Sequence, residues 1–237
     1  MTPEEKARRI IDEKLCQAGW VIQDMNRLNL AVSLGVAVRE FPTSTGEVDY
    51  ALFIDGEPAG VVEAKREEAG QSITDVEIQS GRYAHSTFKW VRKDYFIRFA
   101  YEATDKLIRF TDYKDIKYRS RTVFSFHRPE TLRELLRQPD TIRNNMKHFP
   151  VLDETGFRKC QVNAIKKLEE SFADNRPKAL VQMATGAGKT FTAITASYRL
   201  LKYGKINRIL FLVDTKGLGE QAEREFLAYT PPDAPRS

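Results

Sequence analysis

The alternation of apolar and polar side chains is clearest between residues 35 and 65. Residues 35–41 (GVAVREF) predict one strand. Two more apolar, β-rich runs, 48–54 and 59–65, flank Asp55-Gly56, a dipeptide typical of tight hairpin turns. We therefore predict three consecutive strands, with a polar turn over residues 42–47 leading into a hairpin.

Helical periodicity surrounds these strands. The first predicted helix opens at Thr2 with proline and two acids in its first turn, and it ends before Gly19. The later elements are predicted as a helix over 73–85, strands over 94–101 and 106–111, and a helix over 129–136. This order predicts an α/β fold with a mixed sheet flanked by helices.

The stretch after these strands is harder to interpret. Residues 112–128 are polar and basic, with aromatic side chains between the charges. They fit a solvated connector, which is the commoner case, or a surface that faces DNA. Residues 139–150 look like a linker, so we predict two domains, 1–145 and 146–237.

The second predicted domain has its own pattern. Residues 180–183 and 208–214 are short apolar runs that predict buried strands, and residues 162–171 and 191–201 predict helices. Between the first of these strands and the helix at 191–201 lies Ala184–Thr190 (ATGAGKT). Strand, glycine-rich loop and helix in this order are the context of a phosphate-binding P-loop.

The chemistry of this loop follows from its residue types. Its backbone N–H groups and the helix N-terminus suit phosphate oxygens. Lys189 would reach the β and γ oxygens of ATP, and Thr190 would bind Mg²⁺. The predicted nucleotide-binding residues of the loop are Thr185, Gly186, Ala187, Gly188, Lys189 and Thr190.

Three charged side chains interrupt the predicted hairpin. If Ile54 pairs with Pro58 across a three-residue loop, Asp49 falls opposite Glu63. Side chains alternate along a strand, so Asp49, Glu63 and Lys65 would share one face, away from Tyr50 and its apolar neighbours. Two carboxylates and a lysine suit Mg²⁺ and a water-activating site. Solvated residues on the open face of an amphipathic hairpin are the alternative.

A second pair of polar residues follows at short distance. Gln79 and Tyr83 are four residues apart and would share a helix face. With Asp49, Glu63 and Lys65 they resemble the PD-(D/E)xK core of RecB-like nucleases with its Gln-x-x-x-Tyr extension, although Val48 replaces that family's proline. The resemblance implies these catalytic residues: Asp49, Glu63, Lys65, Gln79 and Tyr83.

The same resemblance implies a metal site. Asp49, Glu63 and the Ala64 carbonyl would bind Mg²⁺, and Glu13 of the first helix is a candidate auxiliary ligand. An exposed helix charge is the alternative interpretation of Glu13.

The glycine-rich loop has the form Ala-Thr-Gly-x-Gly-Lys-Thr, which is typical of superfamily-two helicases. Upstream, residues 156–161 resemble the Q motif of those proteins, in which Arg158 and Gln161 would bind adenine. A RecB-like nuclease ahead of such a motor resembles the R subunit of type I restriction–modification enzymes. A RecB-like repair nuclease–helicase and a non-catalytic DNA-binding module are the alternatives, and the order of the domains favours type I.

The type I resemblance implies an ATP-dependent translocase and endonuclease. It would act on double-stranded DNA with Mg²⁺ and ATP, together with DNA methyltransferase (modification) and specificity subunits. No second acidic helicase motif follows residue 213. We therefore expect a partial RecA-like P-loop domain, from the N-terminal part of a longer protein, without ATPase activity.

Composition changes this picture little. The chain has 237 residues and a formal net charge of +5, a mild excess that is compatible with nucleic-acid binding. Cys16 and Cys160 are the only cysteines and are expected to be reduced thiols in a cytoplasmic protein. No apolar run approaches the length of a membrane span.

Overall fold

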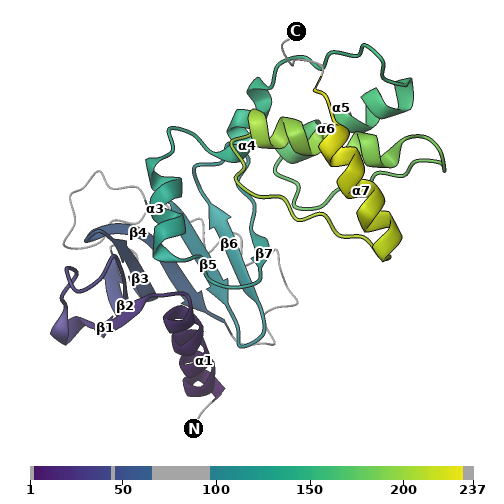
Figure 1. Ribbon diagram of the computed structural model, residues 1–237. Helices are drawn as coiled ribbons and strands as arrows, with labels where there is room; N and C mark the ends of the chain where they lie inside the picture. The colour runs from purple at the N-terminus through teal and green to yellow at the C-terminus, as the bar shows by residue number, and fades with distance from the viewer. Residues whose placement is uncertain (1–2, 44–45, 66–96, 232–237) are drawn as a thin grey trace. The chain divides into compact units, whose positions relative to one another are not determined.

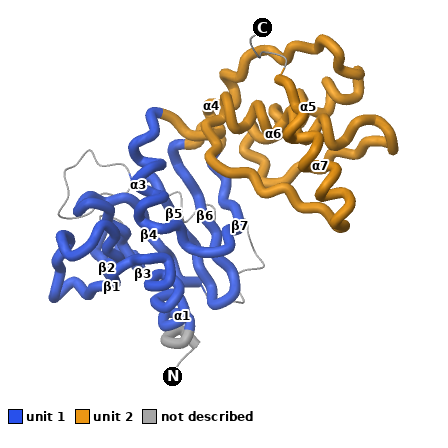
Figure 2. The backbone as a smooth tube through the Cα atoms, in the orientation of Figure 1, with its two compact units in different colours: residues 1–114, 118–139 blue, residues 115–117, 140–237 orange. Residues whose placement is uncertain are grey.

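The computed structural model describes residues 3–43, 46–65 and 97–231 (Figure 1). The chain forms two compact units, one of residues 1–114 with 118–139 and one of residues 115–117 with 140–237 (Figure 2). The last passage between the units falls after residue 139, whereas the sequence placed the domain boundary after residue 145.

A seven-stranded mixed sheet forms the first unit, with its strands in chain order from β1 to β7. β1 (Val21–Asp24) is parallel to β2 (Gly35–Thr43), and β4 (Glu57–Ala64) is parallel to β5 (Phe99–Ala103). All other neighbours are antiparallel. The remaining strands are β3 (Gly46–Ile54), β6 (Ile108–Asp112) and β7 (Arg121–Val123). The mixed α/β class expected from the sequence is confirmed.

Two helices pack on one face of this sheet. Ile11 and Leu15 of α1 (Pro3–Gln17) and Leu132 of α3 (Pro129–Arg137) join a core built on the sheet. Their sheet partners in this first core include Tyr50, Leu52, Ile54, Val62, Phe99 and Phe110. The opposite face carries a second core, which includes Val36, Val38, Phe41, Ala51, Phe53 and Val61. Apolar side chains on both faces bury the central strands almost completely.

Several sequence predictions need correction in this unit. β1, the 3-10 helix η1 (Met25–Arg27) and β7 were not predicted. The turn predicted over 42–47 is too wide, because β2 extends to Thr43 and β3 begins at Gly46. Residues 112–128 are not simply a connector, since they include β7 and the buried ring of Phe126.

The second unit is helical where the structure describes it. It contains α4 (Ile142–Asn145), η3 (Met146–His148), α5 (Lys159–Ala173), α6 (Lys189–Lys202) and α7 (Lys216–Ala228). The short helices occupy the stretch that the sequence predicted as a linker. The Thr141 hydroxyl starts α4 by accepting the Asn144 N–H at 3.1 Å, as an N-cap does.

The two strands predicted in this unit are absent. Neither 180–183 nor 208–214 forms a strand, and their apolar side chains are open to solvent: Leu180 is 94% exposed and Leu210 is 81% exposed. A strand exists only where a neighbour completes its backbone hydrogen bonds. The described residues of this unit contain no other strand to do so.

Two further features are the hydrophobicity of the helices and the state of the cysteines. Across the described ranges, no helix combines the length and apolar character that a membrane crossing requires. Cys16 and Cys160 are both free and exposed.

Candidate active site and nucleotide-binding loop

The hairpin turn between β3 and β4 is shorter than predicted. Asp55 and Gly56 both have positive φ, 52° and 80°, as in a two-residue type I′ turn. Ile54 therefore pairs with Glu57, and the predicted pairing of Ile54 with Pro58 is wrong.

A register shift beside Leu52 then compensates for the shorter turn. Beyond it, Tyr50 pairs with Val62, which is the register that the three-residue loop would have produced. Continued one step further along both strands, this register would bring Asp49 opposite Glu63. Beyond the incorrect turn the strands therefore keep the register that was predicted, because the bulge inserts the residue that the turn lacks.

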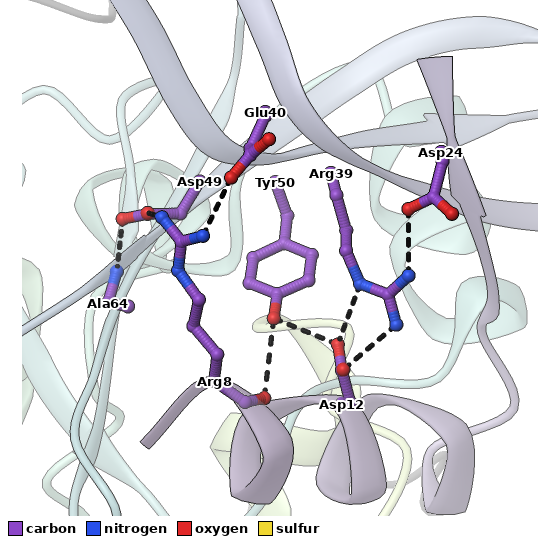
Figure 3. A network of polar contacts seen from close by, with 8 residues as sticks. All are labelled: Arg8, Asp12, Asp24, Arg39, Glu40, Asp49, Tyr50 and Ala64. Atoms are coloured by element: carbon purple, nitrogen blue, oxygen red, sulfur yellow. Dashed lines mark hydrogen bonds and ion pairs between the residues drawn. The ribbon is translucent and has the colours of Figure 1, made fainter. Parts of the chain in front are cut away.

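Both carboxylate oxygens of Asp49 have partners (Figure 3). Oδ2 accepts the backbone N–H of Ala64 at 2.8 Å, and Oδ1 lies 3.2 Å from Nη2 of Arg8. The same guanidinium donates through Nη1 to Glu40 at 2.7 Å. The hydrogen bond to Glu40 and the charges of both acids raise the pKa of Arg8 against the opposing effect of burial. Asp49 is thus oriented by the backbone of β4 and neutralised by α1.

Asp49 does not face away from Tyr50, as strict alternation would require. The Tyr50 hydroxyl donates to Asp12 of α1 at 2.8 Å, so both neighbours reach the same helix (Figure 3). Val48 and Ala51, three residues apart, both pack in the second core. Burial and the hydrogen bond to Asp12 raise the pKa of the Tyr50 phenol, which keeps it protonated as a donor. The predicted separation of Asp49 from the Tyr50 face is therefore wrong.

The adjacent strand changes face at the same level. Arg39 pairs with Tyr50 in the sheet, and Glu40 next to it has a left-handed φ of 50°. Arg39 donates to Asp12 of α1, and Glu40 accepts from Arg8 of the same helix. Both side chains therefore point toward α1 (Figure 3). Val38 and Phe41 on either side both pack in the second core. A single left-handed residue thus accounts for the face change in β2.

Glu63 and Lys65 lie at the end of β4. Lys65 Nζ is 3.8 Å from Glu63 Oε2, and the two side chains are 23% and 14% exposed. The Lys65 N–H donates to the Ala103 carbonyl at 2.8 Å, which holds the strand end against β5. The register of β4 with β5 also aligns Glu63 with Glu102, a buried carboxylate one residue beyond the predicted strand 94–101.

Glu13, the auxiliary metal ligand suggested by the sequence, is placed elsewhere. Its carboxylate accepts from Arg9 at 3.2 Å within the exposed side of α1, where Glu13 is 58% exposed. The α1 side chain that contacts Asp49 is Arg8. Arg8 lies one helical turn from Ile11, so helical spacing from the apolar face could have identified it.

Other predicted site residues are outside the described ranges. Gln79 and Tyr83 fall within residues 66–96. Among the residues that are described, no group of three or more His, Cys, Asp or Glu side chains has the arrangement of a metal site. The predicted donors at the hairpin remain Asp49, Glu63 and the Ala64 carbonyl, and of these Asp49 bonds the backbone N–H of Ala64, next to Glu63. These are oxygen donors of the kind that Mg²⁺ prefers, and Mg²⁺ commonly keeps several waters.

The predicted phosphate-binding loop precedes α6 in the second unit. Gly186 and Gly188 have positive φ, 74° and 82°, and α6 begins at Lys189. Lys189 Nζ donates to the Ala184 carbonyl at 3.2 Å, closing the loop on itself. Thr185 is exposed, whereas Ala187 and Thr190 are half-buried. The loop and the start of the helix follow the predicted order, without the predicted strand before them.

Arg158 and Gln161 are brought to this loop. Arg158 Nη1 donates to the Gly186 carbonyl at 2.6 Å, and Gln161 Nε2 donates to the Ala187 carbonyl at 3.0 Å. Gln161 also accepts the Arg158 N–H at 2.9 Å, which fixes its amide at the start of α5. The two side chains predicted to bind adenine thus hold the loop backbone in this structure.

Comparison with known families adds a match for each unit. Residues 33–106 match the family described as "Type I restriction enzyme EcoKI endonuclease subunit second domain". Residues 154–236 match the family described as "Type III restriction enzyme, res subunit".

Two restriction-enzyme subunits agree with these matches. The chain is 29% identical to the type I restriction enzyme EcoKI endonuclease subunit of Escherichia coli K12, over 92% of this chain and 23% of that subunit. It is 32% identical to the SsaAORF53P endonuclease subunit of Staphylococcus saprophyticus, over 39% of this chain and 10% of that subunit. A fragment structure of a putative HsdR subunit from Vibrio vulnificus YJ016 is 19% identical with a TM-score of 0.37, over 88% of this chain and 39% of that one.

Both units therefore match parts of restriction enzymes. Over most of its length the chain is similar to type I restriction enzyme endonuclease subunits. It spans about a quarter of the length of its E. coli relative, 23%.

Proposed function

We propose that this chain supplies the nuclease site and part of the ATP-binding site of a type I restriction subunit. The first unit would be a PD-(D/E)xK nuclease domain that cuts double-stranded DNA with Mg²⁺. The second would be the first part of a RecA-like translocase domain that uses ATP in the full-length protein.

The arrangement of Asp49 carries the nuclease proposal. Its carboxylate is held at 2.8 Å by the N–H of Ala64, the residue that follows Glu63 on β4. Lys65 follows directly after β4, with Nζ 3.8 Å from the Glu63 carboxylate. Two carboxylates on paired strands, with a neighbouring lysine, suit phosphodiester hydrolysis better than a purely structural hairpin.

Each of these residues has a distinct role in the proposal. Asp49, Glu63 and the Ala64 carbonyl would hold Mg²⁺, which lowers the pKa of a bound water and screens charge on the phosphate. Lys65 would orient the attacking water or stabilise negative charge as it develops on the phosphate oxygens. Gln79 and Tyr83 would position the DNA or the lysine.

The nucleotide proposal rests on the contacts around the P-loop. Lys189 now bonds the Ala184 carbonyl and would exchange it for phosphate oxygens of ATP. Gln161, held by the Arg158 N–H, is at the entrance of α5 beside the loop. The side chains of Arg158 and Gln161 would both turn from the loop carbonyls to the adenine edge when nucleotide binds.

The proposed partners follow from the family. The full-length subunit would act on double-stranded DNA in a cytoplasmic complex with DNA methyltransferase and specificity subunits. These partners would select the site, so that this chain needs no base-reading element of its own.

The proposal is tested by substitution in the full-length subunit, assembled with its partner subunits. Asp49→Ala, Glu63→Ala and Lys65→Ala should each lower Mg²⁺-dependent DNA cleavage by about a hundredfold or more. ATP hydrolysis should persist, because these residues belong to a different unit from the P-loop. Glu130→Ala, which removes an exposed carboxylate in the first turn of α3, is the control and should cut normally. Normal cleavage by Asp49→Ala at saturating Mg²⁺ would contradict the proposal.

A further inference from the structure

A cationic side chain of the protein itself contacts a carboxylate of the proposed metal site. Arg8 Nη2 lies 3.2 Å from Asp49 Oδ1, the oxygen that the Ala64 N–H leaves open. The Arg8 side chain is 47% exposed and the Asp49 side chain is 21% exposed. The ion pair therefore lies at the surface of the first unit, within reach of solvent ions.

A divalent cation and Arg8 cannot both bind Oδ1 with full affinity. The backbone N–H fixes Oδ2, so Oδ1 is the oxygen with the freer lone pairs. A metal ion on Oδ1 would place two positive charges against each other, and their repulsion lowers the affinity of each. Arg8 and a divalent metal therefore compete for the Asp49 carboxylate.

Arg8 also has a second anchor. Its Nη1 donates to Glu40 at 2.7 Å, and Glu40 is 60% exposed. If Arg8 leaves Asp49, the bond to Glu40 keeps the guanidinium close by, at the cost of one of its two carboxylate contacts. Glu40 is on β2, outside the proposed ligand set of Asp49, Glu63 and the Ala64 carbonyl.

We propose that Arg8 is a built-in counter-ion of Asp49 that a divalent metal must displace, and that it thereby sets how tightly the site binds metal. In the metal-free protein Arg8 neutralises the carboxylate. When the metal enters, Arg8 retreats to Glu40 and is available to bind a DNA phosphate. This inference rests on the proposed nuclease site and deepens it by naming the residue that tunes its metal affinity.

The test measures Mn²⁺ binding to the 237-residue chain, with free Mn²⁺ followed by electron paramagnetic resonance. Arg8→Gln should bind Mn²⁺ about three- to fivefold more tightly than the unsubstituted chain, the range expected for a partly exposed ion pair. Arg8→Lys keeps the charge and should bind more nearly as the unsubstituted chain does. Arg9→Gln is the matched control, since Arg9 lies on the same helix but pairs with Glu13, and it should change nothing.

Salt distinguishes competition from a structural effect. The difference in Mn²⁺ affinity between Arg8→Gln and the unsubstituted chain should decrease as ionic strength rises, because salt screens exposed charges. Unchanged or weaker Mn²⁺ binding by Arg8→Gln would overturn the role of Arg8.

Asp49→Asn tests the metal site separately from the role of Arg8. If it binds Mn²⁺ as the unsubstituted chain does, the metal site itself is wrong. If it loses binding while Arg8→Gln gains none, the site stands and only the counter-ion inference fails.

Discussion

Arg98 and Asp112 face each other through two hydrogen bonds, from Nε to Oδ1 at 2.8 Å and from Nη2 to Oδ2 at 2.7 Å. Both side chains are only 6% exposed. Arg98 Nη1 also donates to the Leu135 carbonyl of α3 at 2.5 Å. This bidentate pair therefore joins the region where β5 and β6 meet to the helix that covers the sheet.

Removing one partner of this pair should be costly. Asp112→Asn leaves the Arg98 charge buried without its counter-charge, and we expect a loss of about 3–5 kcal/mol in the free energy of unfolding. Urea denaturation followed by circular dichroism measures it. Glu13→Gln, which breaks the exposed pair with Arg9, should cost less than about 1 kcal/mol. Equal effects of the two substitutions would contradict the assigned role of burial.

Gly60 permits the close approach of β4 and β5. A Cβ at this position would lie 2.7 Å from the Phe99 carbonyl oxygen, a backbone atom that cannot rotate away. Gly60→Ala should therefore destabilise the first unit by about 1–3 kcal/mol. Thermal unfolding provides the measurement. Gly217→Ala in α7 is the control, because a Cβ there meets nothing within 4 Å and should be neutral or slightly stabilising. A Gly60→Ala chain as stable as the unsubstituted one would show that the strands can separate at no cost.

His127 should make stability depend on pH. Burial lowers the pKa of His127 to about 4, assisted by the charge of Arg121, and the Tyr101 hydroxyl lies 2.7 Å from His127 Nδ1. Because the pKa of the folded state is below the unfolded value near 6.5, the contribution is complete above about pH 6.5 and decreases as the pH falls toward 4. Between pH 7 and pH 5 we expect a loss of about 1–2 kcal/mol.

Urea midpoints at pH 7 and pH 5 measure this dependence. His127→Asn lacks the titrating ring and should show a smaller decrease than the unsubstituted chain over the same interval. His148 lies on the short helix η3 of the second unit, so His148→Asn is the comparison and should retain the decrease. A decrease that His127→Asn leaves unaltered would assign the pH dependence to other groups.

Gln161 should restrain the P-loop. Its amide donates to the Ala187 carbonyl at 3.0 Å, and the loss of one such hydrogen bond is worth about 1 kcal/mol. Gln161→Ala should therefore speed amide hydrogen exchange in residues 184–190 about fivefold. Mass spectrometry of peptides covering the loop measures it. Asn163→Ala, at an exposed position on the same helix, is the control. Equal exchange in the two variants would mean that the loop is held by other contacts.

The sequence by itself determined the local elements. Alternating apolar residues specified the strands around Asp55-Gly56, and helical spacing specified the faces of α1 and α3, because these patterns depend only on neighbours within one or two turns. The glycine-rich loop ahead of α6 was equally readable, since Gly186 and Gly188 adopt the positive φ that glycine tolerates without steric cost. The register of the hairpin was likewise predicted from neighbouring residues, although the predicted turn was one residue longer than the turn in the structure.

Only the tertiary structure decided which distant residues meet. Arg8 and Asp49 are 41 residues apart in sequence, and their contact depends on how Ile11 and Leu15 seat α1 on the sheet. The left-handed φ of Glu40, which turns two neighbouring side chains of β2 toward that helix, has no signal in a period-two pattern. The apolar runs at 180–183 and 208–214 were predicted as strands that do not form, since apolar residues alone do not make a strand. A strand needs a partner for its backbone hydrogen bonds, and that partner is supplied by the fold rather than by the segment.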